Sequence, residues 1–182
     1  LPFNFSFYGE TYSDVGVGSN GYLIFDGSAS EFTNATIPSP AAPNAIIAPF
    51  WDDLDPSSAG AIYTRYDEAE DRFIVQYDDV EKFFSTNRYT FQVILYADGT
   101  IKFQYETMDP ADSATIGVEN ATGTDGLQVV FNAPYAEDGL AVAIQTAPQY
   151  LTLSPTSASL SGGASETFTV GFDATDLDQG LY

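Results

Sequence analysis

The chain has 182 residues, of which 44% are apolar and 15% aromatic, so it can bury a sizeable core. Its 5 lysines and arginines against 26 aspartates and glutamates give a formal net charge of −21. This charge repels nucleic-acid phosphates and anionic lipid headgroups, so we expect neither nucleic-acid binding nor membrane insertion. The absence of histidine and cysteine removes Ser-His-Asp, Cys-His and zinc-histidine chemistry, and we predict that the protein is not an enzyme.

Short apolar stretches recur along the chain, rich in β-branched and aromatic residues and bounded by Gly, Pro, Asn or Asp. This pattern is typical of an antiparallel β-sandwich, and no convincing amphipathic helix interrupts it. We therefore predict an all-β, jelly-roll-like sandwich in residues 1–147. Its ten predicted strands span residues 3–8, 22–25, 46–51, 61–66, 73–77, 89–96, 101–105, 115–119, 127–131 and 140–144.

Residues 91–105 form the clearest hairpin. A two-residue loop would place Leu95 opposite Lys102, whereas a three-residue loop, with Gly99 in the left-handed region, places Leu95 opposite Ile101. Because the second register gives one unbroken apolar face, we predict the three-residue loop. The same register also pairs Val93 with Phe103 and Phe91 with Tyr105.

Composition changes near Ala147-Pro148, and we predict a second, partial immunoglobulin-like β unit in residues 148–182. Three short strands are expected there, at residues 151–153, 157–160 and 166–172, whereas an immunoglobulin-like fold needs about seven. Such a unit is incomplete, so a neighbouring chain is predicted to complete it by strand complementation, giving a head-to-tail fibre. The predicted interaction residues are Phe168, Val170 and Phe172 on the open face, and Phe3, Phe5 and Phe7 on a donor strand.

Several motifs resemble one known family: residues 1–9 (LPFNFSFYG), 19–25 (SNGYLIF), 47–54 (IAPFWDDL), 91–105, 114–120 and 126–131. Over about residues 1–146 they resemble the nidogen-like β-sandwich domains of bacterial extracellular proteins. The tail from Tyr150 resembles the first part of a bacterial immunoglobulin-like repeat of the BACON type, although the closing strands of that repeat are absent. This resemblance implies a secreted or cell-surface module. A start at Leu1 without a signal peptide indicates a processed or excised piece.

Two oxygen-rich stretches are candidate calcium sites. Asp52, Asp53 and Asp55 follow an apolar run, and hard cations are bound by several converging oxygen ligands. The alternative is that these carboxylates bind backbone amides of a tight turn, since their spacing is not that of an EF-hand loop. The second stretch, with Glu119, Asn120 and Asp125, is open to the same two interpretations, calcium or a hairpin turn. Calcium is the one cofactor that the sequence suggests.

The preferred function is a non-catalytic structural or adhesion module whose partners are other copies of itself or other surface proteins. The alternatives are a carbohydrate-binding module and an accessory domain of a larger secreted hydrolase. Phe83-Phe84, followed by Ser85-Thr86-Asn87, could form an aromatic platform for glycans. In a sandwich with this many aromatic residues, however, the default place for any one of them is the core, and for Trp51 we predict a core position.

Overall fold

The computed structural model describes residues 1–145, 151–154, 165 and 167–172. The chain divides into two compact units, Leu1–Gln145 and Thr146–Tyr182. Every regular element in the described residues is a β-strand, which confirms the all-β fold. None of these residues belongs to a helix long and apolar enough to cross a membrane. The predicted boundary at residue 147 falls in 146–150, outside the described residues.

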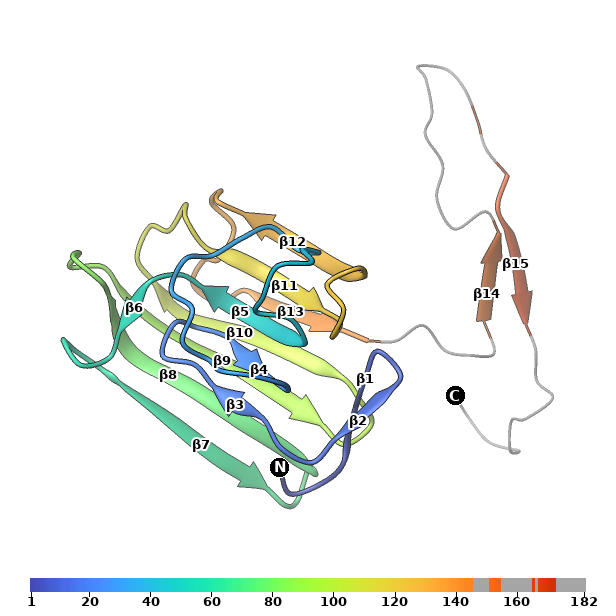
Figure 1. Ribbon diagram of the computed structural model, residues 1–182, viewed down its shortest axis with the longest axis horizontal. Helices are drawn as coiled ribbons and strands as arrows, with labels where there is room; N and C mark the ends of the chain where they lie inside the picture. Colours follow the sequence, from blue (N-terminus) through green and yellow to red (C-terminus); the bar gives the residue numbers. More distant parts are fainter. Residues whose placement is uncertain (146–150, 155–164, 166, 173–182) are drawn as a thin grey trace. The chain divides into compact units, whose positions relative to one another are not determined.

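The first unit contains two large antiparallel sheets and a separate two-stranded one (Figure 1). The larger sheet has the spatial order β13 (Ala141–Ile144), β10 (Ile101–Met108), β9 (Arg88–Tyr96), β8 (Arg72–Lys82) and β6 (Leu54–Asp55), and β7 (Ala61–Asp67) also pairs with β8. The smaller sheet has the order β12 (Gly126–Phe131), β11 (Thr115–Glu119), β5 (Ile46–Trp51), β4 (Leu23–Ile24) and β3 (Gly16–Val17). A hairpin of β1 (Phe5–Phe7) and β2 (Glu10–Tyr12) precedes them. Among the described strands β7 pairs with β8 alone, so its outer edge is open.

All ten strands predicted for this unit are present, and β2, β3 and β6 are additional short ones. The largest difference in length is in β8, which continues past its predicted end at Tyr77 to Lys82. A bulge makes this possible, because the register with β9 shifts between Tyr77 and Val80, where Asp79 adopts a φ of 52°. The bulge lets both Tyr77 and Val80 point into the core.

The hairpin of β9 and β10 has the predicted register. Ile101 lies opposite Leu95, and Gly99 has a φ of 88° in a three-residue loop. The other two predicted pairs, Phe103 with Val93 and Tyr105 with Phe91, are also present. Their side chains lie in the core between the sheets, so the apolar pattern alone was sufficient to select the register.

The main core lies between the two sheets and contains side chains from both. Each large apolar side chain buried there contributes about 1.5–3 kcal/mol. Two tyrosines of the larger sheet also hydrogen-bond across the core: Tyr77 Oη donates to Gly18 O at 2.6 Å, and Tyr105 Oη donates to Pro49 O at 2.7 Å. These bonds satisfy the buried hydroxyls, and burial raises the pKa of both groups.

A second, smaller core covers the opposite face of the smaller sheet. Residues 26–45, which connect β4 to β5, run over this face (Figure 1) and place Ile37 against it. Trp51 is buried there beside Tyr22, as predicted, and its Nε1 donates to Glu31 O at 3.3 Å. Because both faces of β5 are covered, all six of its residues are buried.

In the second unit, β14 (Leu151–Ser154) pairs antiparallel with β15 (Thr169–Phe172). These strands correspond to two of the three predicted there. The third, at residues 157–160, lies outside the described residues.

Candidate functional site

The acidic stretch 52–55 lies at the corner where the chain leaves β5 and enters β6, so that it passes from one sheet to the other. Asp52 is buried, and its carboxylate accepts hydrogen bonds from Lys82 Nζ at 2.6 Å and Ser113 Oγ at 2.8 Å. The amide of Asp53 donates to the other carboxylate oxygen of Asp52 at 2.9 Å. Lys82 ends β8, so its ammonium supplies a counter-charge from the larger sheet.

The other two acidic residues of this stretch have different surroundings. Burial is the largest cause that raises the pKa of Asp53, and the charge of Asp52 raises this pKa further. Asp55 closes a tight turn, because its carboxylate accepts bonds from the amide and hydroxyl of Ser57 and from Ser58 Oγ, which lower the pKa of Asp55. The part of the chain that the structure describes has no group of three or more acidic side chains placed to hold a metal ion. Calcium at Asp52, Asp53 and Asp55 stays a prediction.

The second predicted calcium site lies at the turn between β11 and β12. Glu119 is almost fully buried, and its carboxylate accepts the amide of Ser39 at 2.5 Å. In the orientation that suits its neighbours, the Asn44 carboxamide donates to the other oxygen at 2.9 Å. Asn120 Oδ1 accepts the amide of Asp125 at 3.3 Å, within the loop. These contacts match the turn interpretation, and calcium at Glu119, Asn120 and Asp125 also stays a prediction.

Burial raises the pKa of Glu119, while the hydrogen bond from Ser39 lowers it by a smaller amount. The folded protein therefore holds the Glu119 proton more tightly than the unfolded chain does. Stability from this group is greatest at low pH and declines as the pH rises above the ordinary pKa of 4.5.

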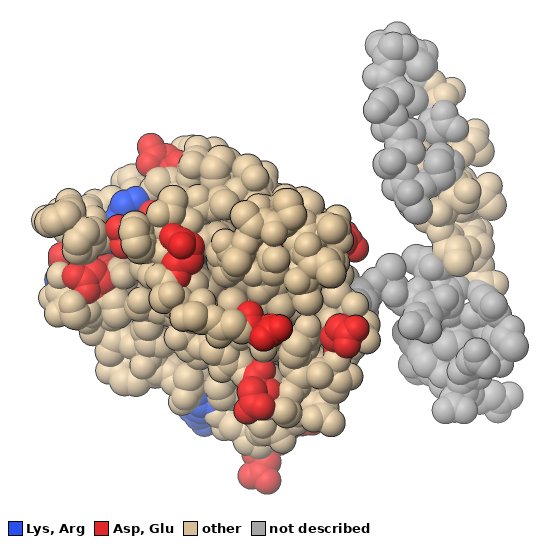
Figure 2. Space-filling model, in the orientation of Figure 1, with Lys and Arg blue, Asp and Glu red and all other residues tan. Residues whose placement is uncertain are grey.

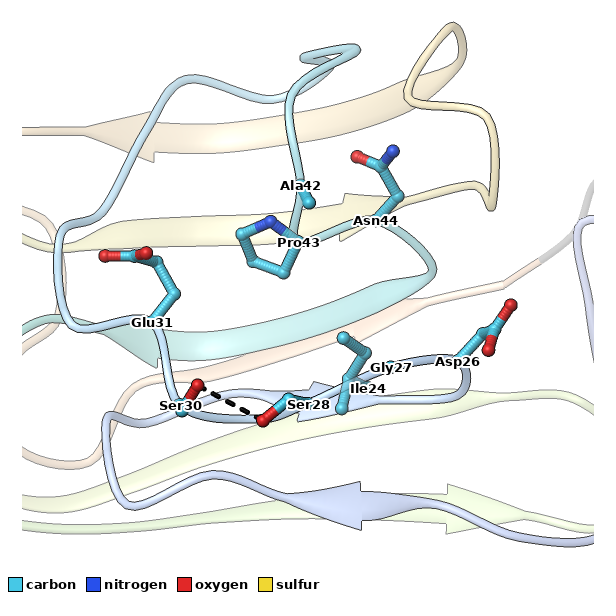
Figure 3. Close-up of a pocket in the computed structure, with 9 residues that line it drawn as sticks. All are labelled: Ile24, Asp26, Gly27, Ser28, Ser30, Glu31, Ala42, Pro43 and Asn44. Carbon is cyan, nitrogen blue, oxygen red and sulfur yellow. Dashed lines mark hydrogen bonds between the residues drawn. The ribbon is translucent and has the colours of Figure 1, made fainter.

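A shallow hollow of about 270 Å³ lies between the segment after β4 and the segment before β5 (Figure 3). Its polar groups come from Asp26, Ser28, Ser30, Glu31 and Asn44. The two hydroxyls hydrogen-bond to each other at 3.1 Å. Figure 3 shows the carboxylates of Asp26 and Glu31 at opposite ends of the hollow, directed away from each other.

The structure separates the predicted interaction residues into two groups. Phe5 and Phe7 are buried in the core of the first unit, where Phe5 stacks on Phe25 and Phe7 packs against the same ring at a tilt of 46°. Phe3 packs against Tyr66. The strand that was predicted to be donated is thus already paired with β2 of its own chain.

The second group lies on the β14–β15 hairpin and is exposed. Val170 is opposite Leu153, and Phe172 shares their face because side chains alternate along a strand. Phe172 is 76% exposed, and Phe168 is also exposed. The hairpin thus presents one apolar face.

The aromatic pair at the β8–β9 turn is not part of the core. Phe84 is 95% exposed and has a φ of 52°, and its ring centroid lies 4.1 Å from that of Phe83. Both the exposure and the left-handed conformation are unusual for phenylalanine.

Acidic side chains are spread over the face of the first unit that Figure 2 shows, and few basic ones are visible there. Some of the basic residues are neutralised by direct ion pairs, such as Arg72 with Asp67 and Arg88 with Asp79, both at 2.8 Å. The electrostatic field is therefore unfavourable to polyanions.

Two antiparallel sheets around a shared core define the class of the protein as a β-sandwich. The chain belongs to the NIDO-related family, whose model matches residues 1–170. Nidogen-like domains are typically extracellular. The match continues past the predicted boundary at residue 147, and the likeness of the C-terminal segment to a BACON-type repeat stays a prediction. No solved structure matches the chain.

Proposed function

We propose that the protein is a non-catalytic structural or adhesion module of a secreted or surface protein, and that its second unit binds other copies or other surface proteins. The family supports an extracellular role. The lack of histidine and cysteine supports a non-catalytic one. A screen against peptide, ester and glycoside substrates tests the second point, and turnover that disappears when one acidic residue is replaced would contradict it.

The observation that carries the proposal is the apolar face of the β14–β15 hairpin. Leu153, Val170 and Phe172 are exposed on a two-stranded sheet, and an isolated two-stranded sheet is marginally stable in water. Covering this face with a second protein surface removes apolar area from water and stabilises the hairpin. Repeated contact between the hairpin of one copy and another surface of the next produces an open, head-to-tail fibre.

The buried positions of Phe5 and Phe7 bear on how such a fibre forms. Donation of β1 to another copy would remove both rings from the core of the first unit, which costs several kcal/mol. The hairpin face requires no such rearrangement. In the proposed fibre, contact through the hairpin is therefore favoured over exchange of β1.

Single substitutions on the two faces of the hairpin test this proposal. Val170→Asp places a charge on the apolar face, whereas Thr152→Asp places the same charge on the opposite face, where Thr152 is paired with Gly171. Light scattering and electron microscopy of the full chain should show that only Val170→Asp abolishes oligomers or filaments. A monomeric wild-type protein, or assemblies that survive both Val170→Asp and deletion of residues 150–182, would refute the proposal.

A further inference from the structure

A row of uncharged polar side chains crosses the solvent-facing side of the larger sheet. Tyr63 of β7 lies opposite Gln76 of β8, which lies opposite Gln92 of β9, and Gln92 lies opposite Gln104 of β10. Their neighbours along each strand, such as Tyr77 and Phe91, point into the core, so the row faces solvent. Four adjacent strands place its ends about 14 Å apart.

The surface along this row is hollowed. A depression of about 240 Å³ is lined by Tyr63, Arg65, Ile74 and Gln92, among others, and a second of about 250 Å³ includes Gln92 and Gln104. Because Gln92 lines both, a ligand lying along the row contacts both depressions. The carboxamides of Gln76 and Gln92 are half-buried, so they lie in the surface rather than projecting from it.

The chemistry of the row suits a ligand rich in hydroxyl groups. Each carboxamide both donates and accepts hydrogen bonds, as hydroxyls do. Gln92 Nε2 donates to Gln76 Oε1 at 2.7 Å, which fixes the orientation of the pair, and none of the hydrogen bonds among the described residues uses the Gln104 carboxamide. Tyr63, 57% exposed at one end, offers an aromatic face with a polar tip.

Charge distinguishes between ligand classes. The four side chains of the row are uncharged. Arg72 pairs with Asp67, and Lys102 Nζ lies 5.6 Å from the centroid of the Tyr96 ring, whereas Arg65 lines the first depression and Glu106 the second, one charge of each sign. A net charge of −21 further disfavours polyanions. We propose that this row is a binding site for an extended, neutral glycan that lies across β7, β8, β9 and β10. The row belongs to the first unit, whereas the β14–β15 hairpin belongs to the second.

Calorimetric titration of the full chain with cellohexaose, xylohexaose, mannohexaose and laminarihexaose tests the proposal. At least one should bind, with an affinity that does not change between low and high salt because the ligand is uncharged. Gln92→Ala and Tyr63→Ala should each weaken binding about threefold to tenfold. Gln145→Ala and Tyr135→Ala, which remove the same side chains from exposed positions outside the row, should leave the affinity unchanged.

Three outcomes would overturn the proposal. The first is that none of the four oligosaccharides binds. The second is that the Tyr63→Ala, Gln92→Ala double variant binds with unchanged affinity, while Phe84→Ala abolishes binding. That result would place the glycan site at the β8–β9 turn. The third is salt-sensitive binding of polygalacturonate that depends on Arg65, which would make this an anion site. Thermal unfolding of each variant separates a lost contact from a lost fold.

Discussion

The ion pair between Asp52 and Lys82 should contribute more to stability than the surface pairs do. The Asp52 side chain is 7% exposed and that of Lys82 is 25% exposed. Removing one partner of a buried pair costs about 3–5 kcal/mol. Because Lys82 retains some contact with water, we expect Asp52→Ala to cost about 2–3 kcal/mol. Asp52→Asn preserves the shape and the acceptor for the Asp53 amide, so it should cost about 1–2 kcal/mol.

Urea unfolding measures these differences directly. Asp79→Asn is a matched control, because Asp79 pairs with Arg88 but its side chain is 66% exposed, and such a pair is worth less than about 1 kcal/mol. A double-mutant cycle that adds Lys82→Met to Asp52→Asn should give a coupling energy above about 1 kcal/mol. If Asp52→Asn costs no more than Asp79→Asn, and the coupling energy is near zero, the pair does not hold the corner between the sheets.

Three other features of the fold also have measurable consequences. Gly21→Ala should lower the free energy of unfolding by more than about 3 kcal/mol, because a Cβ there would lie 1.8 Å from Phe50 O. Gly139 has a similar φ of 80° but open space around it, so Gly139→Ala should cost only about 1–2 kcal/mol. Equal costs for the two would contradict the close approach. The melting temperature should fall as the pH rises above 4.5 through the raised pKa of Glu119. Glu119→Gln should reduce this fall, and an equal fall in the variant would assign the pH dependence to other groups. Saturating calcium should raise the melting temperature if residues 52–55 bind it, whereas identical curves in calcium and in chelator would favour the turn interpretation.

The sequence was most informative where side-chain alternation could be checked against turn geometry. In the β9–β10 hairpin only one loop length keeps Leu95 and Ile101 on the same face, so both the strands and their register could be predicted. That register already places Gln92 beside Gln104. The polar row was therefore partly visible in the sequence, but its extension to Tyr63 required the pairing of β7 with β8.

Other features depend on contacts between distant residues, for which the sequence gives no local signal. The partners of Asp52 lie 30 and 61 positions away, at Lys82 and Ser113. Residues 26–45 lack a repeating pattern, yet they cover the second face of β5. The bulge at Asp79 interrupts the alternation of β8, which is why that strand was predicted to end too early.

Because β7 has an open edge, added salt should affect the aggregation of this protein as well as its folding stability. Backbone amides and carbonyls along that edge can pair with the same strand of another molecule, which is a common route to aggregation. At low ionic strength the charge of −21 keeps molecules apart, but repulsion among the charges of one molecule also destabilises its folded state. Added salt screens both effects, so it should raise the melting temperature while shortening the time for which a concentrated solution stays clear. Folding stability and colloidal stability should thus respond to ionic strength in opposite directions.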